Sequence, residues 1–238
     1  MIVCLDSGNS RIKWGVHDGE RWLDQGAIDH ARSTELSALP AAWPKPERVL
    51  LANVAGNVAL ARIREALDAW SPMLREVRTE AKRAGVTNGY TRPEQLGVDR
   101  WCALIGARNL SSAACVVVMA GTATTVDTLD SAGNFLGGLI LPGDELMRRV
   151  LARDTAALPF AEGHYARYPR CTNDAIVSGA IEAQAGAIER AYLRLDGVDR
   201  LCFLSGGNAH RLAEHLGIPC RLVDHLPLEG LRTLASTA

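Results

Sequence analysis

From its second residue the chain reads Ile2-Val3-Cys4-Leu5-Asp6-Ser7-Gly8-Asn9-Ser10-Arg11-Ile12-Lys13-Trp14-Gly15-Val16. The apolar run at 2–5 is typical of a buried strand, and the alternating run that starts at residue 11 is typical of a second one. The Gly, Ser and Asn residues between them predict a tight turn. Such a turn points several backbone N–H and hydroxyl donors at one place, which suits a phosphate group.

A second stretch past the midpoint repeats this pattern. The apolar run Cys115–Met119 breaks at Ala120-Gly121-Thr122-Ala123-Thr124 and resumes through Thr125, Val126 and Asp127. Each strand pair is followed by a third predicted strand, at Arg21–Ile28 and at Phe135–Leu141. The repetition suggests two related halves that hold a phosphate between them.

Helices alternating with short strands follow each set of three strands. Helical spacing of apolar residues predicts helices, and apolar runs predict further strands. The predicted helices are 57–70, 101–110, 144–151, 173–195 and 209–216, and the further strands are 49–51 and 201–204. Three prolines at 40–46 predict a loop. Two duplicated α/β domains are therefore expected, at 1–112 and 113–238.

The composition favours a globular protein without a dedicated nucleic-acid or membrane surface. The 238 residues are 47% hydrophobic and 22% charged, and the formal net charge is −1. Proteins that bind nucleic acids or membrane surfaces usually carry a basic excess. The six cysteines form no C-x-x-C pair, the chain opens directly on a strand, and no apolar run approaches the length of a membrane span. A cytoplasmic protein with free thiols is expected.

The first turn carries a carboxylate and a nearby amine. Asp6 ends the first strand and could hold a metal ion through water, while Lys13 could reach a phosphate from the second strand. An ordinary hairpin turn with a solvent-facing lysine explains the same residues.

Two further turns are candidates for nucleotide binding. Gly121-Thr122-Ala123-Thr124 is rich in hydroxyl groups for a turn, although threonine is also a common strand residue. Gly206-Gly207 follows the strand at 201–204, and paired glycines permit close approach of a flat ligand such as a nucleobase. Taken alone, the second turn is a weak signal, because Gly-Asn at 207–208 also forms an ordinary helix cap.

Gly97-Val98-Asp99-Arg100 places an acid and a base at the start of a helix. Asp99 is favourable there because of the helix dipole, which gives a structural explanation for it. Arg100 is unfavourable in the first turn unless it has an anionic partner. A general base beside a substrate-binding arginine would account for both residues.

Taken together, these motifs resemble the superfamily of acetate and sugar kinases, heat-shock-70 proteins and actin. Within it, the chain is similar to type III pantothenate kinases, which include the Bvg accessory factors. The segments that carry the resemblance run in order through nearly the whole chain: 6–13, 90–100, 121–127, 137–143, 172–179 and 205–207. The resemblance implies two duplicated ribonuclease-H-like (actin-like ATPase) domains, each a mixed sheet with flanking helices, with the active site in the cleft between them.

The resemblance also implies an activity, the ATP-dependent phosphorylation of pantothenate to 4′-phosphopantothenate in coenzyme A biosynthesis. Asp99 would be the general base. Pantothenate would contact a set of residues around it and one residue from the partner subunit of a homodimer: Tyr90, Gly97, Val98, Asp99, Arg100 and the partner-contributed Thr172.

ATP and ions are assigned by the same resemblance. Asp6 would organise Mg²⁺, and Asp127 would help to bind a monovalent cation, K⁺ or NH₄⁺. The ATP contacts would come from the three turns: Asp6, Ser7, Gly8, Asn9, Ser10, Arg11, Ile12, Lys13, Gly121, Thr122, Thr124, Gly206 and Gly207.

Three alternatives remain open at the level of sequence. The chain could phosphorylate another small hydroxylated substrate such as a sugar, although a neutral sugar offers Arg100 no anion. It could be a regulatory accessory protein for transcription, although it has no recognisable DNA-reading element. It could also be a nucleotide-binding module without transfer chemistry.

Overall fold

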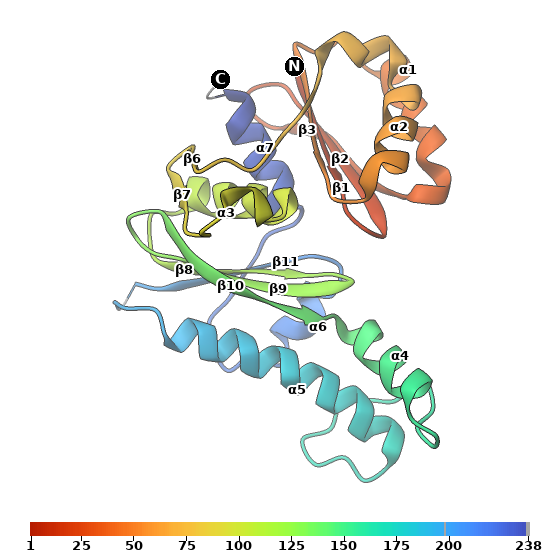
Figure 1. The fold of residues 1–238 in the computed structure, drawn as a ribbon, viewed down its shortest axis with the longest axis vertical. Helices are drawn as coiled ribbons and strands as arrows, with labels where there is room; N and C mark the ends of the chain where they lie inside the picture. Colours follow the sequence, from red (N-terminus) through yellow and green to blue (C-terminus); the bar gives the residue numbers. More distant parts are fainter. Residues whose placement is uncertain (198, 237–238) are drawn as a thin grey trace. The chain divides into compact units, whose positions relative to one another are not determined.

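The computed structural model describes residues 1–197 and 199–236, and the chain divides into two compact units (Figure 1). Unit 1 comprises residues 1–112 and 133–135 together with the segment that starts at His225. Unit 2 comprises residues 113–132 and 136–224. The domains expected at 1–112 and 113–238 stay a prediction, and by its contacts the last helix, α7 (Leu226–Ser236), belongs with unit 1.

Unit 1 is built on a mixed five-stranded sheet in the order β3-β2-β1-β4-β5. The first strand pairs antiparallel with the second and parallel with the fourth. The predicted strands at 2–5, 11–17, 21–28 and 49–51 are all present, and the observed bounds are β1 (Ile2–Ser7), β2 (Arg11–His17), β3 (Trp22–Asp29), β4 (Arg48–Asn53) and β5 (Leu74–Glu76).

Successive side chains of a strand point to opposite faces of the sheet, and different helices pack on the two faces. Val3 and Leu5 pack in one apolar cluster with residues of α2 (Gly56–Ala66), η1 (His30–Ser37) and α1 (Ala38–Ala42). Cys4 and Asp6 point to the other face, where α7 packs on β1 and against α3 (Val98–Leu110). Figure 1 shows α3 and α7 side by side. A side chain at Gly230 of α7 would overlap the Cys102 carbonyl of α3, so glycine is needed at this crossing.

Unit 2 contains a second mixed sheet in the order β12-β11-β8-β9-β10. Alternate residues of β8, Val116 and Val118, pack beneath the long helix α5 (Thr172–Leu193). The first two residues of β10 belong to unit 1, where they pair with β7 (Val86–Asn88), the antiparallel partner of β6 (Lys82–Arg83). The strands of unit 2 are β8 (Cys115–Ala120), β9 (Ala123–Leu129), β10 (Asn134–Pro142), β11 (Leu201–Ser205) and β12 (Arg221–Leu222).

Several predicted elements differ at their ends. The predicted loop at 40–46 is wrong at its start, because α1 includes Pro40; proline is tolerated in a first helical turn, where the N–H groups have no intrahelical partner. The predicted helix at 57–70 is α2 followed by a separate 3₁₀ helix, η2 (Asp68–Met73). The other predicted helices are present as α3, α4 (Asp144–Asp154), α5 and a shorter α6 (Ala209–Ala213). In the part of the chain that the structure describes, no helix is both long and apolar enough to cross a membrane.

Candidate active site

Asp6 and Lys13 face each other on neighbouring strands of unit 1. They are register partners in the antiparallel pairing of β1 and β2, so both side chains lie on the face on which α7 packs. Asp6 is only 5% exposed, and its Oδ1 atom has no hydrogen-bond partner, like the buried hydroxyl of Ser7. Burial raises the pKa of Asp6 to about 7; Lys13 lowers it and nearby Asp99 raises it. The buried, unpartnered oxygen of Asp6 suits a hydrated cation, whereas the Ser7 side chain points to the opposite face of the strand.

The turn that follows Asp6 has the predicted tight form. The Gly8 amide donates to the Arg11 carbonyl at 3.1 Å, and His30 Nε2 lies 2.6 Å from the Gly8 carbonyl oxygen. The Arg11 guanidinium pairs with Asp29 at 3.0 Å, and the Ile12 side chain lies in the core. Any contact of Ile12 with a nucleotide would therefore use its backbone, while Asn9 and Ser10 lie exposed at the tip.

The acid predicted as the general base lies in the first turn of α3. Gly97 caps the helix, and Asp99 Oδ1 accepts a 2.9 Å hydrogen bond from the backbone N–H of Arg100. A Cβ atom at position 97 would come within 2.7 Å of this carboxylate oxygen. Glycine at 97 thus leaves room for the half-buried Asp99 carboxylate in this orientation.

Arg100 and Tyr90 contact each other directly. Arg100 is buried, and its Nη1 atom donates to the Tyr90 hydroxyl at 3.1 Å. The guanidinium carbon lies 5.7 Å from the Tyr90 ring centroid and 5.9 Å from that of Phe135. Asn88 holds the loop in place, because its Oδ1 accepts from the Tyr90 amide at 3.0 Å. Phe135 was not predicted as a site residue, since an apolar residue at the start of a strand carries no functional signal.

The hydroxyl-rich turn of unit 2 presents its threonines to opposite faces of the sheet. Thr124 Oγ1 donates to Gln184 Oε1 of α5 at 2.5 Å, so this hydroxyl points beneath the helix. Thr125 and Asp127 point to the other face; both are buried, and the Thr125 hydroxyl has no hydrogen-bond partner. Gly121 and the exposed Thr122 form the tip, where the Thr122 carbonyl accepts from the Gly143 amide at 2.9 Å.

The two glycines after β11 have different local requirements. Gly206 has a positive φ of 103°, and a Cβ atom there would lie 2.4 Å from the Ala120 carbonyl oxygen. Gly207 has open space where a side chain would be. Gly206 therefore shapes the turn against the end of β8, and Gly207 leaves an accessible surface beside it.

Thr172 lies away from these turns in unit 2. It begins α5, twelve residues before Gln184, which corresponds to about 18 Å along the helix axis. It lines a groove of about 580 Å³ whose other walls are mainly apolar: Pro142, Met147, Val150, Leu151, Leu158, Ala175, Ile176, Gly179 and Ala180.

Each unit thus assembles its own set of predicted residues. Unit 1 brings Asp6, Lys13 and Asp99 near one another, with Tyr90 and Arg100 in contact beside Asp99. Unit 2 joins the 121–125 turn to the Gly206 turn. Among residues 1–197 and 199–236, no group of three or more His, Cys, Asp or Glu side chains forms a ready metal site. A cation at Asp6 would therefore take its other ligands from substrate or water, as Mg²⁺ commonly does.

The sequence is similar to those of type III pantothenate kinases. The sequence profile of type III pantothenate kinases matches residues 2–194. A type III pantothenate kinase of Dechloromonas aromatica is 66% identical over 235 residues, covering 99% of both chains.

Solved structures with little sequence similarity share the fold. A protein of Campylobacter jejuni assigned to the Baf family of transcriptional activators has 19% identity, a TM-score of 0.66 and coverage of 98% and 97% of the two chains. A Sinorhizobium meliloti protein assigned as a 2-dehydro-3-deoxygalactonokinase has 16% identity, a TM-score of 0.62 and coverage of 99% and 98%. The predicted pair of duplicated actin-like ATPase domains, each a mixed sheet with flanking helices, is confirmed. The chain belongs to the type III pantothenate kinase family.

Proposed function

We propose that Asp99 is the general base as this kinase transfers a phosphoryl group from ATP to the terminal hydroxyl of pantothenate, the first step toward coenzyme A. The observation that supports this role most strongly is the first turn of α3, where a half-buried carboxylate lies beside the buried Arg100 and its half-buried partner Tyr90. An ordinary carboxylate is a weak base, but it suffices when proton transfer is late in a loose transition state, and its positioning contributes roughly 10²–10⁴-fold.

Arg100 and Tyr90 are proposed to bind pantothenate. A buried guanidinium needs anionic or polar partners, and the pantothenate carboxylate can accept a bidentate pair from it. Tyr90 already accepts a hydrogen bond from Arg100, which orients both groups. The backbone of Gly97 and Val98, at the N-terminal end of α3, would add N–H donors.

Asp6 and Lys13 are proposed to act on the phosphates of ATP. The unpartnered Oδ1 atom of Asp6 fits a hydrated Mg²⁺, which when bound would neutralise charge on the transferring group. Lys13, opposite Asp6, would contact a phosphate oxygen, and the N–H groups of Asn9, Ser10 and Arg11 would supply further donors at the turn that the Gly8 amide closes.

The turns of unit 2 are proposed to bind the rest of the nucleotide. Gly121, Thr122 and the backbone of Thr124 would contact phosphates, and the open surface at Gly207 beside Gly206 would accept the adenosine.

Asp127, buried on the same sheet face as Thr125, would help to bind K⁺ or NH₄⁺. Turnover in potassium buffer that falls in sodium buffer, and an Asp127→Asn variant that no longer distinguishes the two, would support this assignment.

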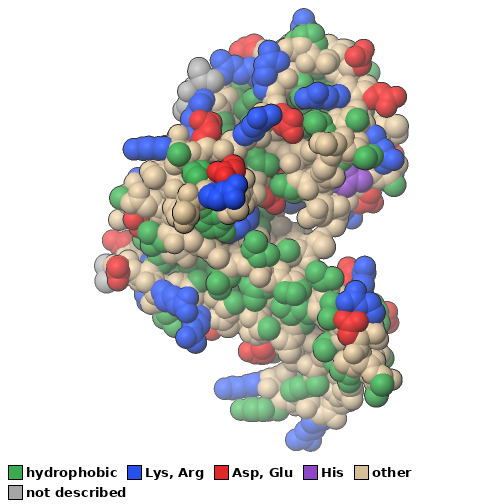
Figure 2. Space-filling view, in the orientation of Figure 1, with side chains coloured by type: hydrophobic (Ala, Val, Ile, Leu, Met, Phe, Trp, Pro, Cys, Tyr) green, Lys and Arg blue, Asp and Glu red, His purple; other side chains and the backbone are tan. Residues whose placement is uncertain are grey.

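The active form is proposed to be a homodimer in which Thr172 completes the partner's pantothenate site. The groove that contains Thr172 is lined by Pro142 at the end of β10, and the same strand carries two exposed apolar side chains, Leu136 (62% exposed) and Ile140 (66% exposed). Figure 2 shows hydrophobic side chains gathered over this part of unit 2. A second copy of the chain would cover them and bring a polar threonine to its neighbour.

Light scattering of an Ile140→Asp variant tests the dimer. We expect a monomer with a raised KM for pantothenate, whereas Val58→Asp, at a similarly exposed apolar residue of α2, should stay dimeric. A dimeric Ile140→Asp protein with normal kinetics would contradict the proposal.

A reducing cytoplasm is proposed as the compartment, because all six cysteines are free.

Coupled measurement of ADP release with a panel of acceptors tests the substrate assignment. Pantothenate should support turnover that neutral sugars do not, since a sugar gives Arg100 no anion. Turnover with a sugar that exceeds turnover with pantothenate would overturn the assignment.

A further inference from the structure

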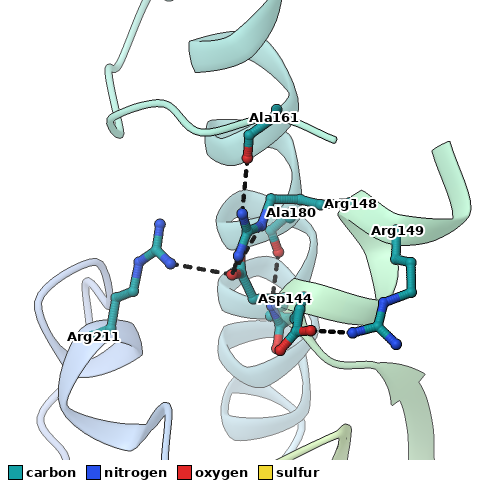
Figure 3. Close-up of polar contacts among 8 residues, drawn as sticks. Asp144, Arg148, Arg149, Ala161, Ala180 and Arg211 are labelled. Carbon is teal, nitrogen blue, oxygen red and sulfur yellow. Dashed lines mark hydrogen bonds and ion pairs between the residues drawn. The ribbon is translucent and has the colours of Figure 1, made fainter. Parts of the chain in front are cut away.

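Asp144, at the first position of α4, holds two arginines with one carboxylate oxygen (Figure 3). Arg148 contacts Asp144 Oδ2 through Nη2 at 2.9 Å and Nε at 3.2 Å, and also donates to the Ala161 carbonyl at 2.8 Å. Arg211, from α6, contacts the same oxygen through Nη1 at 3.1 Å. The Asp144 side chain is 7% exposed and the Arg148 side chain 15%, so this pair is largely shielded from water, whereas Arg211 is 40% exposed.

The second oxygen of this carboxylate is buried without a hydrogen-bond partner. An unsatisfied buried acceptor costs free energy, and a buried ion pair is a weak source of net stability compared with apolar packing. A contribution to stability therefore does not explain well why an aspartate is present at position 144. The segments that it connects suggest another role.

Asp144 directly follows Gly143, which packs on the turn formed by Gly121 and Thr122. The Gly143 amide donates to the Thr122 carbonyl at 2.9 Å. A Cβ atom at Gly143 would lie 2.2 Å from the Gly121 carbonyl oxygen, so the backbone here is pressed against the turn. A shift of Asp144 would therefore displace Gly143, which is in direct contact with Gly121 and Thr122.

Arg211 likewise lies close in sequence to a proposed nucleotide-binding turn, the one formed by Gly206 and Gly207. It lies in the short helix that directly follows Gly206, Gly207 and Asn208. The Asn208 amide donates to the Ala120 carbonyl at 3.0 Å, next to Gly121. The Asp144–Arg211 pair therefore links two segments that both pack against the end of β8, and closes a ring of contacts within unit 2.

We propose that Asp144 and Arg211 are positioning residues that fix the Gly121–Thr122 turn and the Gly206–Gly207 turn at the spacing that ATP requires. This rests on the nucleotide role proposed above for the two turns. Neither side chain needs to touch ATP. Apart from Thr172, the residues proposed to bind pantothenate lie in unit 1, so pantothenate binding should depend on the pair much less than ATP binding does.

Steady-state kinetics of Arg211→Gln and Asp144→Asn test this role. Each should raise the KM for ATP on the order of tenfold, because small displacements of binding groups are costly, and leave the KM for pantothenate within about twofold. Arg211→Lys should restore most of the loss, since Arg211 uses a single nitrogen. Arg211 is 40% exposed, so its variants should fold even if Asp144→Asn does not.

Glu145→Gln is the matched control. Glu145 lies on the same helix, next to Asp144, and pairs with Arg149 at the surface, where the two side chains are 61% and 65% exposed. The same loss of one carboxylate charge should leave both KM values unchanged. If the control raises the KM for ATP as much as Asp144→Asn does, helix charge rather than the pair is responsible, and the proposal is overturned.

Gly207→Val separates failure of this inference from failure of the nucleotide assignment. Its side chain would enter open space and obstruct a nucleotide there. If Gly207→Val raises the KM for ATP but Arg211→Gln does not, the positioning role is wrong and the nucleotide site stands. If Gly207→Val has no effect, the nucleotide assignment is wrong and the inference falls with it. Equal rises in both KM values for Arg211→Gln would also overturn it.

Discussion

Asp6 and Lys13 are register partners on antiparallel strands, and their side chains share the sheet face on which α7 packs. The amine of Lys13 favours the ionised form of Asp6, yet burial outweighs it and raises the pKa of this carboxyl to about 7. The protein thus keeps a carboxylate where its charge is unfavourable, beside the half-buried carboxylate of Asp99. Such a site is better suited to a cation and phosphates than to stability.

The first prediction concerns the pH dependence of stability in the protein free of metal and nucleotide. Asp6 binds its proton more tightly when folded, with a pKa near 7 against 3.8 in the unfolded chain. Its contribution to stability is therefore present below pH 3.8 and is lost as the pH rises toward 7. Asp6→Asn should remove this loss. The free energy of unfolding of the variant, compared with that of wild type, should therefore rise between pH 5 and pH 8, as measured by urea unfolding at the two pH values.

The control for this experiment is the exposed Asp24 of β3. Asp24→Asn should show the same change in unfolding free energy between pH 5 and pH 8 as wild type. Equal pH dependence of wild type and Asp6→Asn would mean that Asp6 is already ionised at pH 5, contrary to this account.

A second prediction separates the two residues proposed to bind pantothenate. Arg100→Lys keeps the charge but loses the planar pair of donors, and should raise the KM for pantothenate about 10–100-fold. Tyr90→Phe removes one hydroxyl and should have a smaller effect, about 2–10-fold. The KM for ATP should stay near the wild-type value in both. A rise confined to the KM for ATP would contradict the assignment of this pair to pantothenate.

A third prediction uses the close approach of Gly97 to the proposed base. The backbone at 97 has ordinary dihedral angles, so alanine is permitted there, but its Cβ would crowd Asp99 Oδ1 at 2.7 Å. Gly97→Ala should therefore displace the carboxylate and lower kcat by about tenfold with little change in melting temperature. An unchanged kcat would indicate that the orientation of Asp99 seen here is unimportant for turnover.

The neighbouring glycines after β11 give a fourth prediction, measured by thermal unfolding without ligands. Gly206→Ala combines a positive φ with a Cβ placed 2.4 Å from a backbone oxygen, and should cost about 1–3 kcal/mol. Gly207→Ala meets open space and should leave the melting temperature near that of wild type. Similar losses for both variants would contradict the geometry of this turn.

Much of the fold could be predicted from local sequence patterns. The two strand–turn–strand repeats predicted β1, β2, β8 and β9, because the alternation of a strand and the residue types of a turn depend on residues that are adjacent in sequence. The placement of Asp99 and Arg100 in a first helical turn followed from the same kind of signal.

Features that depend on contacts between distant segments were not predictable. Helix α7 packs on α3, more than a hundred residues earlier, and no local pattern pairs Gly230 with Cys102. Thr124 follows Thr122 in a hydroxyl-rich turn, yet strand alternation directs its hydroxyl to Gln184 of α5. The Asp144–Arg211 pair spans 67 positions, and in sequence Asp144 reads as an ordinary first-turn aspartate.

The most direct test of the account is the rate of pantothenate-dependent ADP release by Asp99→Asn and by wild type, at saturating ATP, Mg²⁺ and pantothenate. The amide keeps the size of the side chain and an oxygen that can accept from the Arg100 amide, so the fold should persist. We expect kcat to fall by roughly 10²–10⁴-fold, with pantothenate and ATP still bound in calorimetry. A kcat within about twofold of wild type would show that another group accepts the proton, and would contradict the role assigned to Asp99.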